Sequence, residues 1–260
     1  NIKKGRARAI VANSGNANAC TGEAGLRSAR FTVDRLAEHL GIRPEEVLVA
    51  STGVIGAPLN TEVVGKALPE LVAGLSADAI PRVVEAIMTT DSFPKLSSFE
   101  GNAGSKPYKI LGMAKGAGMI MPDMATMLCF ILTDIALHST RLHEALAWGV
   151  ERTFNRISVD GDMSTNDTVF LIANGAAGNG SLSPEDFHGF KSGLTRVMED
   201  LSTMIVRDGE GATKLIRIKV KGAASAGDAL TADRTVANSS LVKTAIYGSY
   251  PNWGRIMAAL

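Results

Sequence analysis

The chain has 260 residues, 45% of them apolar and only 5% aromatic, which suits one large soluble domain or two small ones. Its 27 basic residues nearly balance its 26 acidic ones, so the charge does not indicate a protein that binds nucleic acid or another polyanion. Cys20 and Cys129 lie far apart, and no apolar run resembles a membrane span or a signal peptide, so we expect a cytoplasmic protein without disulfides and without membrane contact.

The first half of the chain predicts short strands that alternate with helices. Brief apolar runs are followed by apolar residues at helical spacing, with residue types between them that commonly begin or end helices. The expected elements, in chain order, are a strand over residues 7–12, a helix that ends at Gly41, a strand over residues 47–50, a helix from Asn60 to Leu75 and a helix over residues 77–88.

A polar loop follows each of the two expected strands. Residues 13–22 (NSGNANACTG) are dense in Asn and Gly, and such a loop suits a structured turn as well as a binding site. Residues 51–56 (STGVIG) present backbone N–H groups and a hydroxyl at a sheet edge, where they can hold an oxyanion or a carboxylate. Because glycine is common where strands turn, the second loop alone is a weak indication of a site.

The middle of the chain places a hydroxyl at the start of a buried strand. A glycine-rich approach (residues 115–125) leads to Thr126 and then to an apolar strand over residues 129–132. A Thr in this position could attack the carbonyl of Ala125, cut the chain, and use its freed α-amine as a base. The stretch also fits a glycine-rich loop that leads into a core strand, and taken alone it favours that simpler interpretation.

The second half continues the alternation of strands and helices, so we expect an α/β or α+β layered fold. No internal repeat or low-complexity linker divides the chain. The expected elements are a hairpin strand over residues 108–114, a helix capped by Ser139, a strand over residues 169–173, a helix capped by Ser183, an alternating strand over residues 215–220, a helix over residues 223–237 and a final helix after residue 255.

Two acidic segments in this half are candidates for ligand binding. Residues 159–167 (VDGDMSTND) contain an Asp-x-Asp pattern but lack the glycine and the terminal glutamate of a calcium loop, so we expect no metal there. Glu210 stands between two glycines, which leave room for a ligand amine beside its carboxylate. A solvated loop acid is the competing interpretation.

The residue inventory excludes several kinds of active site. The four histidines fall in expected helices or at a strand-to-helix junction, so neither a Ser/His/Asp nor a Cys/His apparatus is indicated, and no His/Cys cluster suggests zinc. The segment at Lys115 lacks the order of Gly, Lys and Ser/Thr found in phosphate-binding loops. Hydroxyl chemistry without histidine remains, and it suits a self-generated N-terminal Thr.

Several long motifs, in a fixed order, give the chain a resemblance to a known family. Together they resemble the ornithine acetyltransferase family, also called glutamate N-acetyltransferase, and the resemblance covers essentially the whole chain. The motifs are residues 13–22, 51–56, 89–95 (TTDSFPK), 115–128 (KGAGMIMPDMATML), 160–167, 207–214 (RDGEGATK) and 251–255 (PNWGR).

The resemblance implies an architecture and an assembly. Two β-sheets are expected between helices, similar to the N-terminal-nucleophile hydrolases but with different connectivity. Family members cut themselves between Ala and Thr, which implies an α-subunit portion of residues 1–125 and a β-subunit portion of residues 126–260, joined in a heterotetramer of two α and two β subunits. Family chains extend further at both ends, so we expect a segment of a longer protein. Asp123 stands where the family usually has Asn.

The resemblance also implies an activity and its residues. The family moves an acetyl group from N-acetylornithine to glutamate in arginine biosynthesis, through an acetyl ester on the new N-terminal Thr. By carry-over, Thr126 is the nucleophile, and Thr52 and Gly53 form the oxyanion hole. Thr90, Lys115 and Glu210 join Thr126 in binding substrate. No metal or organic cofactor is required, and acetyl-CoA stays open as a second acetyl donor.

Two other classes of protein remain open at this point. A self-processing hydrolase or aminopeptidase would have a similar N-terminal Thr but would pass the acyl group to water. An inactive, truncated remnant would keep the motifs without the activity.

Overall fold

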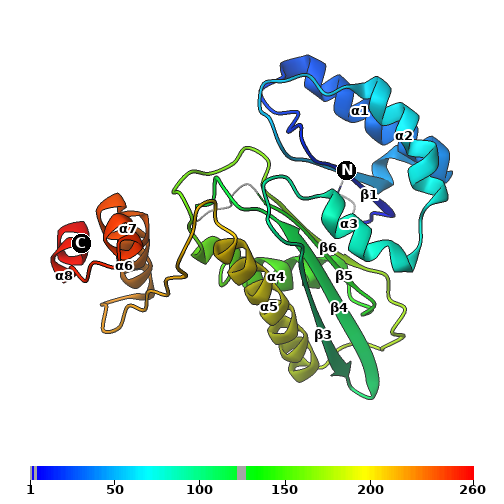
Figure 1. The fold of residues 1–260 in the computed structure, drawn as a ribbon. Coiled ribbons are helices and arrows are strands. Elements are labelled where there is room, and N and C mark those ends of the chain that lie inside the picture. The colour runs from blue at the N-terminus through cyan, green and yellow to red at the C-terminus, as the bar shows by residue number, and fades with distance from the viewer. Residues whose placement is uncertain (1, 3–4, 122–126) are drawn as a thin grey trace.

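The computed structural model describes residue 2 and residues 5–121 and 127–260, and Figure 1 shows their arrangement. Short 3-10 turns at Pro44–Glu46, Ala77–Ala79 and Phe154–Arg156 separate some of the longer elements. These elements are β1 (Ala9–Asn13), α1 (Gly22–Leu40), β2 (Val47–Ser51), α2 (Thr61–Ala73), α3 (Ile80–Ala86), β3 (Lys95–Ala103), β4 (Lys106–Lys115), β5 (Leu128–Thr133), α4 (Ser139–Val150), β6 (Thr168–Ala173), α5 (Pro184–Arg207), α6 (Ala226–Asn238), α7 (Ser240–Tyr247) and α8 (Trp253–Ala259).

The strands form two sheets. β1 and β2 pair in parallel, with Ala9 opposite Val47. The larger sheet has the order β3-β4-β5-β6, in which β3, β4 and β5 are antiparallel neighbours and β6 runs parallel to β5. The connection from β5 to β6 passes through α4, because parallel neighbours need a long crossover.

Alternation along the strands builds the layers. Successive side chains of a strand point to opposite faces, so Cys129 and Ile131 of β5 pack with α4 and α5, while Leu128 and Phe130 pack with α3 and the smaller sheet. On the outer face of the smaller sheet, Val47 packs against α1 and α2. The expected fold, two sheets between helices, is confirmed (Figure 1).

Most helix ends lie where the sequence places them. Ser183 and Asp186 form a reciprocal capping box at the start of α5, Asn60 caps α2, and α1 ends at Gly41 in the left-handed conformation with φ 62°. One expected cap is wrong, because the side chain that caps α4 is His138 and Ser139 is already the first helical residue.

The expected strand over residues 215–220 is wrong as well. This segment has no regular secondary structure, and Leu215 and Ile216 are each 42% exposed. An alternating pattern forms a strand only when a second strand satisfies its backbone, and no strand among the described residues pairs with it. The segment instead runs extended to the helices at the C-terminal end in Figure 1.

Helices α6, α7 and α8 contact one another and touch the rest of the chain near its 3-10 turn at Phe154–Arg156. Asn238 Oδ1 accepts a hydrogen bond from Ser158 Oγ at 2.5 Å, and Lys243 Nζ donates to the carbonyl of Val159 at 2.5 Å.

None of the helices in the described part of the chain combines the length and the apolar character needed to span a bilayer.

Candidate active site

A buried hydrogen bond joins two of the predicted site residues. Nζ of Lys115, at the end of β4, donates to Oγ1 of Thr52, just after β2, across 3.1 Å, and both residues are 2% exposed. Lys115 also lies opposite Leu128, the first residue of β5. Because Leu128 follows Thr126 by two positions, this pair lies next to the chain that continues from the predicted nucleophile. Thr126 and Ala125 themselves lie outside the described residues.

The turn after β2 presents two neighbouring hydrogen-bond donors. Because Thr52 Oγ1 is the acceptor in its hydrogen bond with the Lys115 ammonium, the hydroxyl proton of Thr52 remains available to a ligand. The adjacent backbone groups are occupied, because Thr52 N donates to Asn13 O at 3.0 Å and Val54 N donates to Gly15 O at 3.3 Å. The N–H of Gly53 has no acceptor among the described residues. These donors suit the oxyanion hole that the sequence predicts, which stays a prediction.

The Asn-rich loop after β1 fixes the shape of this turn. Asn13 donates through Nδ2 to the carbonyl of Asn16 at 2.8 Å and accepts from Ser51 Oγ at 2.7 Å. Gly53 adopts φ 130°, and a Cβ on it would lie 2.2 Å from the carbonyl carbon of Gly15, so only glycine fits. These asparagine side chains hold backbone, which favours the structural interpretation of that loop.

Several charges act on the buried ammonium of Lys115. Burial lowers the pKa of Lys115, and the negative charge of Asp91 opposes that effect. The positive charge of Lys95 lowers it further, while Asp167 and Glu210 raise it. Carboxylates from three separate parts of the chain therefore act on one lysine beside the start of β5.

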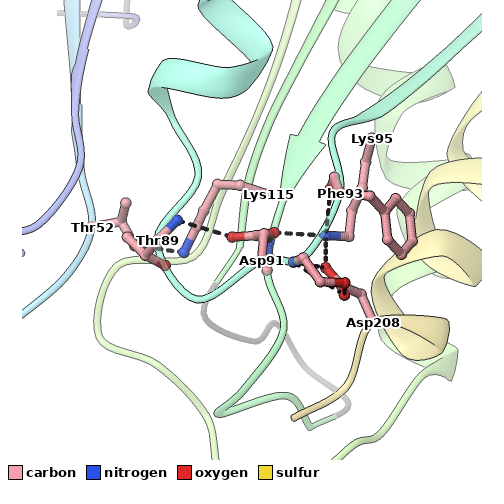
Figure 2. A network of polar contacts seen from close by, with 9 residues as sticks. Thr52, Thr89, Asp91, Phe93, Lys95, Lys115 and Asp208 are labelled. Carbon is pink, nitrogen blue, oxygen red and sulfur yellow. Dashed lines mark hydrogen bonds and ion pairs between the residues drawn. The ribbon is translucent and has the colours of Figure 1, made fainter.

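A second buried lysine holds two of the surrounding segments together (Figure 2). Lys95 Nζ, at the start of β3, donates to Asp91 at 2.7 Å and to Asp208 at 2.5 Å. Asp91 also accepts the N–H of Gly116 at 2.6 Å, and Asp208 accepts the N–H of Ser92 at 3.0 Å. This cluster, the Lys95 network, ties the loop before β3, the loop after β4 and the end of α5 into one unit.

The two carboxylates of the Lys95 network remain charged although they are buried. Burial alone would raise the pKa of Asp91, but the hydrogen bonds from Gly116 N and Lys95 outweigh it, so that pKa lies below its usual value. Burial likewise opposes the contacts of Asp208 with Lys95 and Ser92, and its pKa is lowered too. The network therefore contains one buried cation between two buried anions.

Glu210 lies on the loop that this network anchors. Its N–H donates to the carbonyl of Ala117 at 3.0 Å, which joins it to the glycine-rich loop after β4. A Cβ on Gly118 would lie 2.8 Å from the carboxylate carbon of Glu210, so the space beside that carboxylate comes from Gly118 rather than from Gly209 and Gly211. Glu210 is exposed and has no ion pair among the described residues, so it is available to a ligand ammonium.

The substrate contact expected of Thr90 stays a prediction. Thr90 is exposed and directly precedes Asp91, and its side chain makes no hydrogen bond with the described residues. Sequence reasoning missed the Lys95 network, because Lys95 and Asp208 lie 113 positions apart and no local pattern joins them. The only signal was the presence of Asp91 and Lys95 four residues apart in one motif.

The acidic segment after α4 holds the glycine-rich loop in place. Asp160 accepts the N–H of Ile120 at 2.7 Å and also that of Met119. In the described part of the chain, no three His, Cys, Asp or Glu side chains are grouped so that they could hold a metal ion.

Known proteins are similar to this chain over its whole length. The ArgJ family model matches residues 1–260. A protein of Geobacter sulfurreducens is 53% identical over 258 residues, which are 98% of this chain and 66% of the relative. A protein of Desulfotalea psychrophila is 51% identical over 264 residues, with 100% and 66% covered. Both are named "Arginine biosynthesis bifunctional protein ArgJ".

Two solved structures are also similar. The argJ protein of Bacillus halodurans is 48% identical with a TM-score of 0.48, over 50% of this chain and 62% of that one. Ornithine acetyltransferase of Mycobacterium tuberculosis, solved in complex with ornithine, is 33% identical with a TM-score of 0.40, over 47% and 65%. The chain spans about two thirds of the length of the curated relatives it matches. From the match over its whole length, the chain belongs to the ArgJ family.

Proposed function

We propose that this chain moves an acetyl group from N-acetylornithine to glutamate in arginine biosynthesis, through an acetyl ester on Thr126. The names of its relatives, which are about half identical to it in sequence, support the pathway. The observation that carries the proposal is the buried hydrogen bond between Lys115 and Thr52 beside the start of β5. It puts a cation and a polarised hydroxyl near the chain that continues from Thr126.

The proposed transfer has two halves. In the first, Thr126 Oγ attacks the acetyl carbonyl, and the α-amine of Thr126, with a reference pKa of roughly 8, accepts the hydroxyl proton. The Thr52 hydroxyl and the Gly53 N–H stabilise the oxyanion, and ornithine leaves with the proton. In the second, the amine of glutamate attacks the ester and restores the Thr126 hydroxyl.

Substrate choice follows from the charges around the site. N-acetylornithine carries an ammonium and a carboxylate in addition to its acetylated amine. Glu210 supplies an exposed anion for the ammonium, and Lys115 supplies the cation near the reacting centre. Thr90 is assigned to substrate contact from the motif alone. Acetyl-CoA is the alternative acetyl donor, and no cofactor is needed in either route.

Self-cleavage before Thr126 is part of the proposal. It would give portions of 1–125 and 126–260 that remain together as a heterotetramer of two copies of each in the cytoplasm. Denatured mass spectrometry of the full chain should give two species that split after Ala125. Thr126→Ala should stay whole, because no hydroxyl remains to attack. A parent chain that folds and stays whole contradicts this part.

The transfer itself is tested by supplying N-acetylornithine with and without glutamate. We expect acetylglutamate and ornithine in equal amounts when glutamate is present, and very slow loss of N-acetylornithine when it is absent. Equal rates of loss in both conditions would instead identify a self-processing hydrolase, in which water takes the acetyl group. No turnover in a cleaved, folded chain would identify an inactive remnant.

A further inference from the structure

The Lys95 network adjoins every described residue to which the proposed function assigns substrate binding. Each of those residues lies within two positions of a residue that is hydrogen-bonded in the network. They are Thr90 beside Asp91, Lys115 beside Gly116, and Glu210 near Asp208. Because these segments are far apart in the sequence, their relative positions depend on tertiary contacts such as those of the network.

All the hydrogen-bond donors of the Lys95 ammonium are used within the protein. Its three N–H groups face Asp91 Oδ1 at 2.7 Å, Asp208 Oδ2 at 2.5 Å and the carbonyl of Phe93 at 3.5 Å. The side chains of Lys95 and Asp91 are fully buried, and that of Asp208 is 3% exposed. A buried ion cluster is a weak source of stability, because desolvation of the charges offsets most of their attraction. Its directional bonds instead determine which segments lie together.

One arm of the network fixes the backbone beside Lys115. Oδ1 of Asp91 accepts the N–H of Gly116 at 2.6 Å. Oδ2 of the same carboxylate accepts the N–H of Thr89 at 3.1 Å, and this bond spans Thr90. Hydrogen bonds to a charged acceptor are short and strong, so one buried carboxylate holds both segments in place.

The other arm fixes the loop that carries Glu210. Oδ2 of Asp208, which accepts from the ammonium of the network, also accepts the N–H of Ser92 at 3.0 Å. Two residues further along, the N–H of Glu210 donates to the carbonyl of Ala117 at 3.0 Å. The carboxylate of Glu210 lies against Gly118, where a Cβ would come within 2.8 Å of it. The backbones of two loops that the network joins therefore determine where this carboxylate lies.

We propose that Lys95 and Asp208 are positioning residues that set the spacing between the Lys115 ammonium and the Glu210 carboxylate, a role that rests on the proposed function. When the α-amine of the donor carries the acetyl group, its ammonium stands at the far end of the side chain. Two charges at a fixed spacing match one side-chain length better than its neighbours. The network thereby selects the length of the acetylated amino acid that fits.

The test is a competition between two acetyl donors that differ by one methylene. N-acetylornithine and N-acetyl-lysine, both acetylated on the α-amine, are mixed in equal amounts with glutamate, and mass spectrometry follows the release of ornithine and lysine. The ratio of the initial rates equals the ratio of the two kcat/KM values, which does not change with the fraction of protein that is folded. A merely structural role would leave this ratio unchanged. For the parent we expect a preference for N-acetylornithine of about a hundredfold.

Asp208→Asn keeps the size of the side chain and an oxygen for the N–H of Ser92, but it lacks the charge that holds Lys95. We expect the preference for N-acetylornithine to fall about tenfold. The matched control is Asp200→Asn, since Asp200 is an exposed acid of α5 that accepts from Ser97 Oγ of β3 at 2.8 Å. This bond joins the same helix to the same strand outside the network, so the control should keep the preference of the parent.

The outcomes separate the positioning role from the proposed function. A folded parent that does not turn over N-acetylornithine overturns both. An active parent without a preference for one length, or an Asp208→Asn variant that keeps the preference, overturns only the positioning role. An equal loss of preference in Asp200→Asn overturns that role as well, because any contact between β3 and α5 would then suffice.

Ser92→Ala decides the question if Asp208→Asn does not fold, as judged by circular dichroism. This change removes only the hydroxyl that donates to Asp208, at an exposed residue, and leaves the ion pair with Lys95 in place. We expect the preference for N-acetylornithine to fall about threefold, the scale of one hydrogen bond. An unchanged preference in Ser92→Ala overturns the positioning role.

Discussion

At the scale of single residues, the hydroxyl of Thr52 is the clearest example of a group that is only partly hydrogen-bonded. Its oxygen accepts a hydrogen bond from the buried Lys115, while its proton remains available as a donor. A hydroxyl that accepts from an ammonium is polarised, which strengthens it as a donor. The neighbouring N–H of Gly53 is also free among the described residues. The motif drew attention to both residues, whereas only the structure shows which protons are unoccupied.

Thr52→Ala should lower turnover by about a hundredfold, the usual effect of losing one oxyanion donor. The Michaelis constant for N-acetylornithine should change much less, because the donor acts mainly in the transition state. Steady-state kinetics of the cleaved enzyme measure both. Thr52→Ser keeps the hydroxyl and is the matched control. An unchanged turnover number in Thr52→Ala would place the oxyanion hole elsewhere.

Glu210→Gln should weaken the use of N-acetylornithine by about 1.5–3 kcal/mol in kcat/KM, the scale of a hydrogen bond to a charged group. The reason is its exposed carboxylate, which has no ion pair among the described residues. Self-cleavage should continue, since the loop is held through the backbone of Glu210 at Ala117. If the variant cuts itself and turns over substrate like the parent, Glu210 is only a solvated loop acid.

At the scale of elements, features that depend on neighbouring residues are predicted from the sequence better than features that depend on distant residues. The cap at Ser183 and the helix end at Gly41 depend on residues within a few positions, and both are confirmed. The strand expected over residues 215–220 depends on a partner that local alternation cannot supply, and it is wrong. The bond between Lys95 and Asp208 joins segments 113 positions apart, and no periodicity encodes it.

Lys95→Met should destabilise the protein by about 3–5 kcal/mol, because it leaves two buried carboxylates without their cation. Urea denaturation at pH 7 measures this change. Lys66→Met is the matched control, since its pair with Glu62 is largely exposed and should contribute less than about 1 kcal/mol. If the two substitutions lower the free energy of unfolding equally, the Lys95 network stabilises the fold no more than an exposed ion pair does.

The same network predicts a dependence on pH. The folded pKa values of Asp91 and Asp208 are lowered, so the folded state binds their protons more weakly than the unfolded state does. The stability they contribute is therefore complete above the unfolded value, about 4, and is lost as pH falls through the folded values. The difference between the parent and Lys95→Met should be smaller at pH 3 than at pH 7. A constant difference would contradict the ionised network.

At the scale of the whole molecule, the predicted cut falls between two neighbouring strands of one sheet. β4 lies before it and β5 after it, and they pair from Ile110 opposite Thr133 to Lys115 opposite Leu128. The same core cluster contains Ile110 from one side of the cut and Ile131 and Leu194 from the other. The two portions should therefore elute together in gel filtration and separate only in denaturant. Fragments that separate in native buffer would show that this sheet does not hold them.

That shared sheet changes the molecularity of unfolding. Within one copy of the protein, an uncut chain unfolds as a single molecule, so this step adds no dependence of the thermal midpoint on protein concentration. If the chain is cut between β4 and β5, unfolding of each copy releases two molecules, and mass action makes the midpoint rise more steeply with protein concentration. Dilution should therefore lower the midpoint of the cut chain more than that of the Thr126→Ala chain.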